Sequence, residues 1–121
     1  AEATLLIPPA STREGGGRCS WVLRPHGGPH SMAADAFSVE AALFLSRGIA
    51  LLIPNYRGSL GYGDAFSKVL LGKVSEFDVS DCANLCHTML ASHVDEIDPA
   101  RGAVYGGSHG GFLTAWMLVH E

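Results

Sequence analysis

A chain of 121 residues, 47% of them hydrophobic and 17% charged, is long enough for one domain with a modest core and too apolar to be disordered. Its net charge of −4 argues against nucleic acid and anionic membranes as partners, and no apolar stretch reaches the length of a membrane span. Three cysteines cannot form a fully paired disulfide framework, which favours a reducing compartment, the cytoplasm.

The first half of the chain combines short apolar runs with one helical pattern. Residues 4–7 and 21–23 predict two strands, each followed closely by proline. Between them, the glycine-rich residues 10–18 predict a surface loop. Asp35 is expected to cap a helix, because apolar side chains follow it at the spacing of one helix face: Phe37, Ala41, Phe44 and Leu45.

The middle of the chain predicts a buried strand, a loop and a second helix. Gly48 is expected to end the first helix, and the continuous apolar run 49–53 suits a strand buried on both faces of a parallel sheet. Residues 54–63, rich in glycine and tyrosine, predict a loop. Residues 78–93 predict a helix with one buried face: Val79, Cys82, Ala83, Cys86 and Leu90.

The last part of the chain predicts a short strand at 103–105 and a helix at 112–119. That helix is apolar nearly all round, so it is expected to be central and buried. Alternating strands and helices predict an α/β fold, with a mostly parallel sheet and helices on both faces. The strands at 49–53 and 103–105 are expected to be parallel neighbours in the centre of the sheet.

Cys82 and Cys86 are one helical turn apart, with His87 beside them. A structural zinc site needs four ligands, and the usual paired spacings are absent from the sequence. The two cysteines are therefore interpreted as small apolar residues on a buried helix face. No metal or other cofactor is expected.

The strongest motif is Gly-x-Ser-x-Gly at residues 106–110. It lies directly after a predicted strand and before a predicted helix, where the nucleophile of an α/β hydrolase stands. The strained turn requires small neighbours, so Gly106 and Gly110 are expected to be the elbow glycines and Ser108 the catalytic serine. A phosphate-binding turn is the alternative, but the lysine or spaced glycines of nucleotide-binding loops are absent.

A second glycine-rich loop, His-Gly-Gly-Pro at 26–29, follows an earlier predicted strand. Hydrolysis of a carbonyl substrate needs two backbone N–H groups where the oxyanion forms. One comes from the residue after the nucleophile, His109, and the other from such a loop, here Gly28. Taken alone, the loop could equally be an ordinary Gly-Gly-Pro turn.

Four motifs together resemble the prolyl oligopeptidase family of serine peptidases. They stand in that family's order at residues 26–31 (His-Gly-Gly-Pro-His-Ser), 55–63 (Asn-Tyr-Arg-Gly-Ser-Leu-Gly-Tyr-Gly), 78–81 (Asp-Val-Ser-Asp) and 106–112 (Gly-Gly-Ser-His-Gly-Gly-Phe). The resemblance covers nearly the whole chain. It implies the N-terminal part of an α/β-hydrolase fold, from its first strand through the elbow helix.

Two histidines, His30 and His109, favour the members of this family that release an N-acylated amino acid from a blocked peptide. The resemblance therefore implies an acyl-enzyme on Ser108 and an N-acylated peptide as substrate. It also implies a β-propeller domain, of which nothing is seen in these residues. Ser75 stands where the family usually has glycine, and Arg24 makes the approach to the oxyanion loop more polar than usual.

A serine nucleophile needs a histidine base and an acid that orients the base, and in this fold both follow the serine in the chain. After the elbow motif, which ends at Gly110, the sequence contains no aspartate and a single histidine, His120. That histidine is about 18 Å along the same helix, at 1.5 Å per residue. We therefore expect the triad aspartate and histidine outside residues 1–121, which would form a partial catalytic domain.

Polar residues before the serine have structural interpretations. His26 is expected to shape the oxyanion loop rather than to transfer protons, and His30 is a candidate to face the substrate. Arg57 is expected to tie loops together, because a guanidinium suits a carbonyl-rich loop. Asp78 and Asp81 fit helix capping better than a triad role.

Other functions stay open at this point. A carboxylesterase or another oligopeptidase would use the same fold, and a truncated module without catalysis would act by binding alone. The expected partner is an N-acylated peptide rather than nucleic acid or a membrane. Whether a longer protein forms homo-oligomers is not decided by the sequence.

Overall fold

The computed structural model describes residues 1–120 as one sheet with helices on both faces. Its strands are β1 (Glu2–Leu6), β2 (Cys19–Leu23), β3 (Ile49–Asn55) and β4 (Ile97–Val104). Its α-helices are α1 (Val39–Ser46), α2 (Asp64–Lys68), α3 (Phe77–Ser92) and α4 (His109–His120). Two 3-10 turns, Ala10–Thr12 and Glu14–Gly16, occupy the predicted surface loop.

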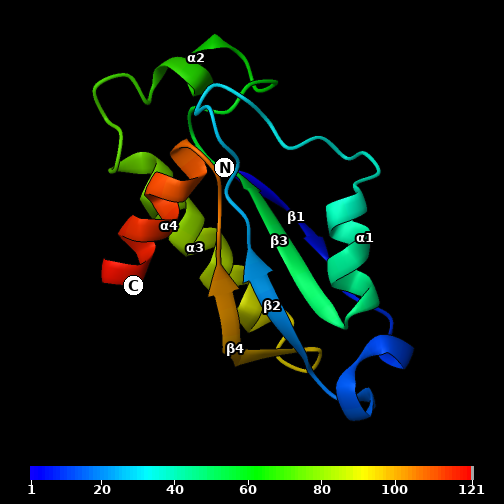
Figure 1. Cartoon of the computed structure of the whole chain (residues 1–121). Coiled ribbons are helices and arrows are strands. Elements are labelled where there is room, and N and C mark those ends of the chain that lie inside the picture. The colour runs from blue at the N-terminus through cyan, green and yellow to red at the C-terminus, as the bar shows by residue number, and fades with distance from the viewer. Residues whose placement is uncertain (121) are drawn as a thin grey trace.

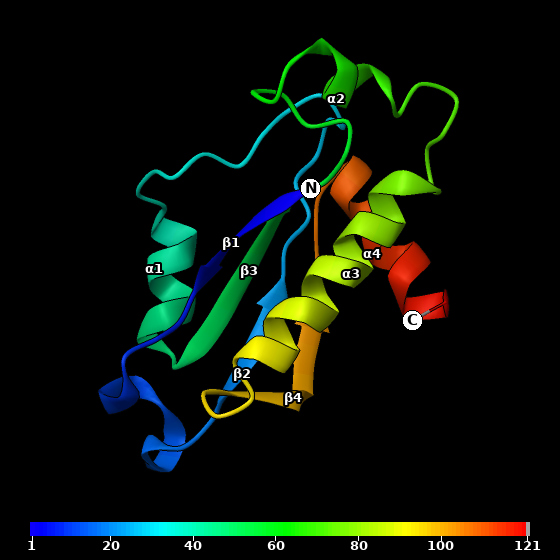
Figure 2. The ribbon, with the colours of Figure 1, turned by 180° about the vertical axis from the view of Figure 1, so that it is seen from behind.

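The sheet has the strand order β1-β3-β2-β4. Strand β2 is parallel to both β3 and β4, whereas β1 is antiparallel to β3. Helix α1 covers one face, and α3 and α4 cover the other (Figures 1 and 2). The predicted α/β fold with a mostly parallel sheet is therefore confirmed.

The predicted pairing of β3 with β4 is wrong, because β2 lies between them. Crossover connections between parallel strands are right-handed. The connection through α1 runs over one face of the sheet, and the connection through α3 runs over the other. Two right-handed crossovers on opposite faces lead in opposite directions, so β3 and β4 end on opposite sides of β2.

The core alternates along the central strands. In β3, Leu51 packs with Val22 and Ala41 on the α1 side, whereas Leu52 faces α3 and α4. The α3 and α4 side buries more side chains, among them Leu23, Tyr56, Val79, Cys82, Cys86, Leu113 and Met117. Successive residues of a strand point to opposite faces, so the continuous apolar run supplies both layers.

Helix α1 begins later than predicted. Its N-cap is Ser38, whose hydroxyl accepts a hydrogen bond from the Ala41 N–H at 3.3 Å. Asp35 lies in the preceding loop and does not cap the helix, and Phe37 is 86% exposed rather than part of the buried face. Gly48, with φ of 71°, ends the helix as expected.

Two further predictions need correction. Helix α4 is not buried all round: it buries Gly110, Leu113 and Met117, but Leu118 and Val119 are more than 70% exposed. Helix α4 packs beside α3 at the outside of the described residues, and Leu118 and Val119 lie on its uncovered face. The predicted loop after β3 is followed by a short helix, α2, which was not predicted because its residues show no apolar periodicity.

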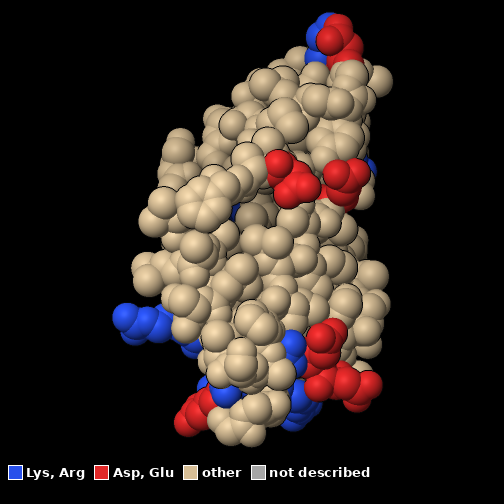
Figure 3. Space-filling view, turned by 90° about the vertical axis from the view of Figure 1, so that its right-hand side faces the viewer, with Lys and Arg blue, Asp and Glu red and all other residues tan. Residues whose placement is uncertain are grey.

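The face on which α1 lies carries several exposed apolar side chains, notably Phe37, Val39 and Leu43. Figure 3 shows that most of this side of the molecule is uncharged. No helix among residues 1–120 is long and apolar enough to cross a membrane.

Ser75, before α3, has a φ of 73°, a conformation that costs a residue with a Cβ about 1–2 kcal/mol. We predict that Ser75→Gly raises the free energy of unfolding by about 0.5–1 kcal/mol, because glycine relieves this strain but loses more backbone entropy on folding. Urea denaturation measures the change. The matched control Ser80→Gly, inside α3, should lower the free energy of unfolding by about 1 kcal/mol. A Ser75→Gly protein less stable than the parent would contradict this account.

Candidate active site

Ser108 occupies the turn between β4 and α4. Its φ is 54°, in the left-handed region that residues with a Cβ rarely adopt. Its carbonyl accepts hydrogen bonds from the N–H groups of Gly111 and Phe112, at 3.0 and 3.1 Å, which begin α4. The serine is exposed. A strained, exposed serine between a strand and a helix is the geometry of a nucleophile elbow.

The two elbow glycines are required by close backbone contacts. A Cβ on Gly106 would lie 2.6 Å from the carbonyl carbon of Gly110. A Cβ on Gly110 would fall well inside van der Waals contact of the Pro25 carbonyl oxygen. The elbow is therefore packed against the segment after β2, and any side chain at these two positions would force them apart.

The loop after β2 reaches the serine itself. A Cβ on Gly27 would lie 3.2 Å from the Gly107 oxygen and 3.4 Å from the Ser108 Cβ. The next residue, Gly28, has a φ of 128°, which glycine adopts without cost. The structure thus brings both glycine-rich motifs together at one point, as their proposed roles require.

His26 is a structural part of this loop. Its Nε2 lies 2.8 Å from the Ser59 hydroxyl, its Nδ1 lies 2.7 Å from the Gly27 oxygen, and its ring stacks on Tyr56 at 4.5 Å. Burial lowers the pKa of His26, so the ring is neutral at pH 7. Since both ring nitrogens have partners within the loops, the residue holds the loop rather than serving Ser108.

The His109 side chain points away from the serine towards α3. Its Nε2 lies 2.8 Å from Oδ2 of Asp78, whose side chain is fully buried. The expected helix-capping role of Asp78 is wrong: beyond its own neighbour Val79 N–H, its partner is this imidazole. A buried carboxylate needs a charged or hydrogen-bonding partner, and the distant His109 outweighs the local backbone.

Asp81 does not cap the helix either. Arg57 donates to it from Nε at 2.8 Å, from Nη2 at 2.6 Å and from its backbone N–H at 2.8 Å. The hydrogen bond to Asp81 raises the pKa of Arg57, and the guanidinium also lies 4.2 Å above the Phe77 ring. Arg57 therefore ties the loop after β3 to α3, which agrees with the expected loop-tying role.

His30 is exposed, and its Nδ1 lies 2.9 Å from the Gly58 oxygen.

Cys82 and Cys86 are buried as predicted, and burial raises the pKa of the Cys86 thiol to about 11, so that thiol is protonated and unreactive. Residues 1–120 contain no group of three or more His, Cys, Asp or Glu side chains that could hold a metal ion.

One polar cluster was not expected from the sequence. Arg24 Nε lies 2.5 Å from a Glu40 carboxylate oxygen and donates to the Tyr105 hydroxyl at 3.2 Å, and that hydroxyl donates to Glu40. These residues come from the end of β2, from α1 and from the position before Gly106. The cluster explains the polar residue before the oxyanion loop, but its members lie too far apart in the chain for a local motif.

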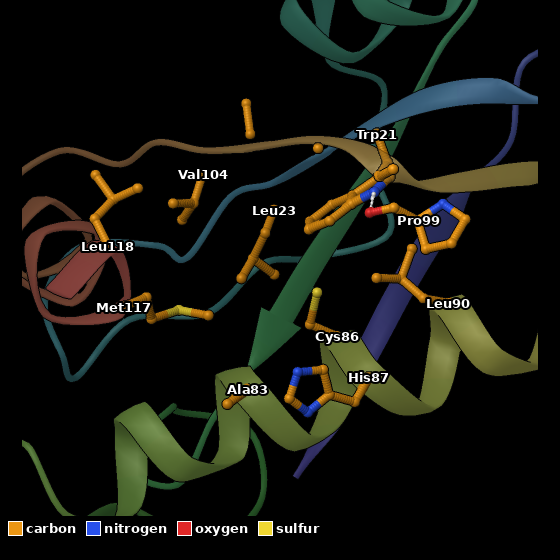
Figure 4. Close-up of a pocket in the computed structure, with 13 residues that line it drawn as sticks. Trp21, Leu23, Ala83, Cys86, His87, Leu90, Pro99, Val104, Met117 and Leu118 are labelled. Atoms are coloured by element: carbon orange, nitrogen blue, oxygen red, sulfur yellow. Dashed lines mark hydrogen bonds between the residues drawn. The ribbon is translucent and has the colours of Figure 1, made fainter. Parts of the chain in front are cut away.

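An apolar cavity of about 520 Å³ lies between α3, α4 and β4 (Figure 4). Leu23, Cys86, Val104 and Met117 point into it, and Trp21 closes one end through a hydrogen bond to the Pro99 oxygen. Ser108 does not line it. The cavity is therefore separate from the elbow.

Comparison with known proteins identifies the family. The model of the prolyl oligopeptidase family matches residues 35–121, well over half of the chain. The chain belongs to the prolyl oligopeptidase family. The acylamino-acid-releasing enzyme of Arabidopsis thaliana is 47% identical over 96 residues, which are 77% of this chain and 12% of that protein. This chain thus spans about an eighth of the length of that relative.

Solved structures agree with the family. Pyrococcus horikoshii acylaminoacyl peptidase is 27% identical, with a TM-score of 0.88 over 98% of this chain and 19% of that one. A puromycin hydrolase is 35% identical, with a TM-score of 0.85 over 98% of this chain and 18% of that one. The α/β-hydrolase fold inferred from the motifs is therefore confirmed, and membership of the prolyl oligopeptidase family supports a peptidase or related hydrolase.

We predict that Gly110→Ala lowers the free energy of unfolding by about 1–3 kcal/mol, because the new methyl group would overlap the Pro25 carbonyl. Gly107→Ala is the matched control. A Cβ on Gly107 would meet nothing within 4 Å, so this variant should stay within about 0.5 kcal/mol of the parent. Thermal and urea unfolding of the two purified variants compare them. Equal stability of both would refute the close contact at Gly110.

Proposed function

We propose that the protein is a serine peptidase that releases an N-acylated amino acid from blocked peptides. The observation that carries this is the left-handed Ser108 at the β4–α4 turn, with the Gly27–Gly28 loop packed against it. Membership of the prolyl oligopeptidase family supports the reaction class. The name of the Arabidopsis thaliana relative, acylamino-acid-releasing enzyme, supports the substrate class.

In this mechanism the Ser108 Oγ attacks the carbonyl carbon of the N-acylated residue. The carbonyl oxygen becomes an oxyanion that accepts hydrogen bonds from the N–H groups of Gly28 and His109. The N-terminus of α4 adds a favourable dipole at the same point. Collapse of the intermediate expels the peptide amine and leaves an acyl-enzyme on Ser108, which water then hydrolyses.

The proton from Ser108 needs a base, and the histidines nearest in the fold are already engaged. His26 bonds Ser59 and Gly27, His30 bonds Gly58, and His109 bonds Asp78. We therefore assign the base and its orienting acid to residues outside this chain. His30, exposed beside the glycine loop, is our candidate to contact the acyl group of the substrate.

The remaining features of the proposal follow from the same residues. No cofactor is required, because a serine, a base and two backbone donors suffice for acyl transfer. Three free cysteines, all buried, support a reducing compartment such as the cytoplasm.

A second candidate is hydrolysis of an amide such as puromycin. It is favoured by one observation: the puromycin hydrolase is more similar in sequence, at 35%, than the archaeal acylaminoacyl peptidase, at 27%. Both candidates use the same nucleophilic attack by Ser108, and they differ in the substrate group that is bound beside the scissile bond. Comparing turnover of acetyl-alanine anilide with turnover of puromycin distinguishes the two candidates, and a short ester as third substrate tests for an esterase.

We predict that Ser108→Ala, in the protein encoded by the full reading frame, abolishes labelling by a fluorophosphonate and turnover of acetyl-alanine anilide. The change removes the nucleophile and leaves a residual acceleration of at most about 10³–10⁴ over water. Ser31→Ala, an exposed serine of the oxyanion loop, is the control and should label normally. Continued labelling of the Ser108→Ala protein at another residue would refute the assignment.

We also predict that the 121-residue chain alone is not an efficient hydrolase. Its serine lacks a free base, and β4 has an unpaired outer edge within the described residues, which invites association with other chains. Turnover of acetyl-alanine anilide by the purified chain, with Ser108→Ala as control, tests this. Serine-dependent turnover within tenfold of the complete enzyme would mean that His26 or His30 acts as the base.

A further inference from the structure

His109 has two separate tasks in this fold. Its backbone N–H is the proposed oxyanion donor, and its side chain bonds another element. The imidazole is 11% exposed and lies 2.8 Å from the Asp78 carboxylate at the start of α3. The ring also contacts Tyr56 at 5.9 Å and Phe112 at 5.5 Å between centroids. The side chain is thus held from three directions.

An aspartate at position 78 is energetically unfavourable unless its carboxylate has hydrogen-bond partners. Its side chain is fully buried, and its remaining oxygen accepts from the adjacent Val79 N–H at 3.0 Å. A buried polar contact such as that between Asp78 and His109 adds little net stability compared with apolar side chains of similar volume, because desolvation offsets the attraction. The hydrogen bond between Asp78 and His109 instead fixes the distance and the orientation of His109, the first residue of α4, relative to α3.

That orientation matters because the backbone of Ser108, directly before the peptide that joins it to His109, is strained. With φ of 54° at Ser108, the elbow persists only if its surroundings hold it. The N–H of this same peptide is the donor on which the oxyanion depends. Anchoring the His109 ring to α3 restricts rotation of the peptide plane, and an error of about 1 Å in such an element lowers a rate by about 10²-fold.

We propose that Asp78 is a positioning residue that fixes the direction of the His109 N–H through the His109 side chain. This role rests on the proposed function. It predicts an effect on the chemical step rather than on substrate binding, because Asp78 is buried behind the elbow and does not reach the surface where a substrate would lie.

The test is a double-mutant cycle in the protein encoded by the full reading frame, with Asp78→Asn, His109→Phe and the double variant. All three keep the backbone N–H at position 109. We expect Asp78→Asn to lower kcat for acetyl-alanine anilide about tenfold with KM changed less than twofold, and to slow fluorophosphonate labelling to a similar extent. The double variant should be no slower than the slower single variant, because both changes break one connection.

Val79→Ala is the matched control for stability. Val79 is the next residue of α3 and is buried in the core. Its apolar side chain forms no hydrogen bond with the elbow. It should lower Tm at least as much as Asp78→Asn while leaving kcat within twofold. Loss of kcat in Val79→Ala equal to that in Asp78→Asn, multiplicative effects in the double variant, or an unchanged kcat in Asp78→Asn would each overturn the proposal. Absence of Ser108-dependent turnover in the parent would instead reject the proposed function, and the positioning role with it.

Discussion

The contact between two backbones, at the elbow and in the loop after β2, is the constraint on which the site depends. Gly110 and Gly27 let the two segments approach closely: a Cβ on Gly110 would overlap the Pro25 carbonyl, and a Cβ on Gly27 would lie 3.2 Å from the Gly107 oxygen. Glycine at these positions is therefore needed for the proposed oxyanion hole, whose two N–H groups must converge on one point. Side-chain identity matters less there than the absence of a side chain.

Helix α3 turns this contact into a rigid arrangement. Its first two turns carry Asp78, which bonds His109 of the elbow, and Asp81, which bonds Arg57 of the loop after β3. The loop after β3 in turn holds His26 of the loop after β2 through Tyr56 and Ser59. Three loops from three strands are thus joined by polar side chains that are buried or half-buried, where such bonds are strongest and their loss is most costly.

The sequence predicted the local parts of this arrangement well. The strand, turn and helix around Ser108, the glycine-rich loop after β2 and the existence of the other strands and long helices follow from motifs and periodicity that span a few residues. The bounds were less accurate: the strand expected at 103–105 is Ile97–Val104, and α1 begins after Ser38. Strand order was not predicted correctly, because it depends on which face each crossover helix occupies. The partners of Asp78 and Asp81 were missed for a related reason: both carboxylates stand where a local cap is plausible, and His109 is 31 residues away from Asp78 in the chain. The exposure of apolar side chains on α1 and α4 was not predicted, because an apolar residue in a sequence does not show whether another element packs against it.

The register of the sheet explains why these distant loops meet. Leu23 of β2 pairs with Leu52 of β3 and with Val104 of β4, so β2 and β4 end side by side, whereas β3 continues in the same direction to Asn55. The loops that follow them, at 24–28, 56–59 and 105–108, must then emerge at one edge of the sheet. Ligands of open α/β sheets bind at this edge. A slip of one residue between β2 and β4 would move the Pro25 carbonyl by about 3.3 Å relative to Gly110, which would destroy the close contact. The parallel sheet is therefore the element that aligns Ser108 with the glycine-rich loop after β2, and the glycines allow the close contact that the proposed oxyanion hole requires.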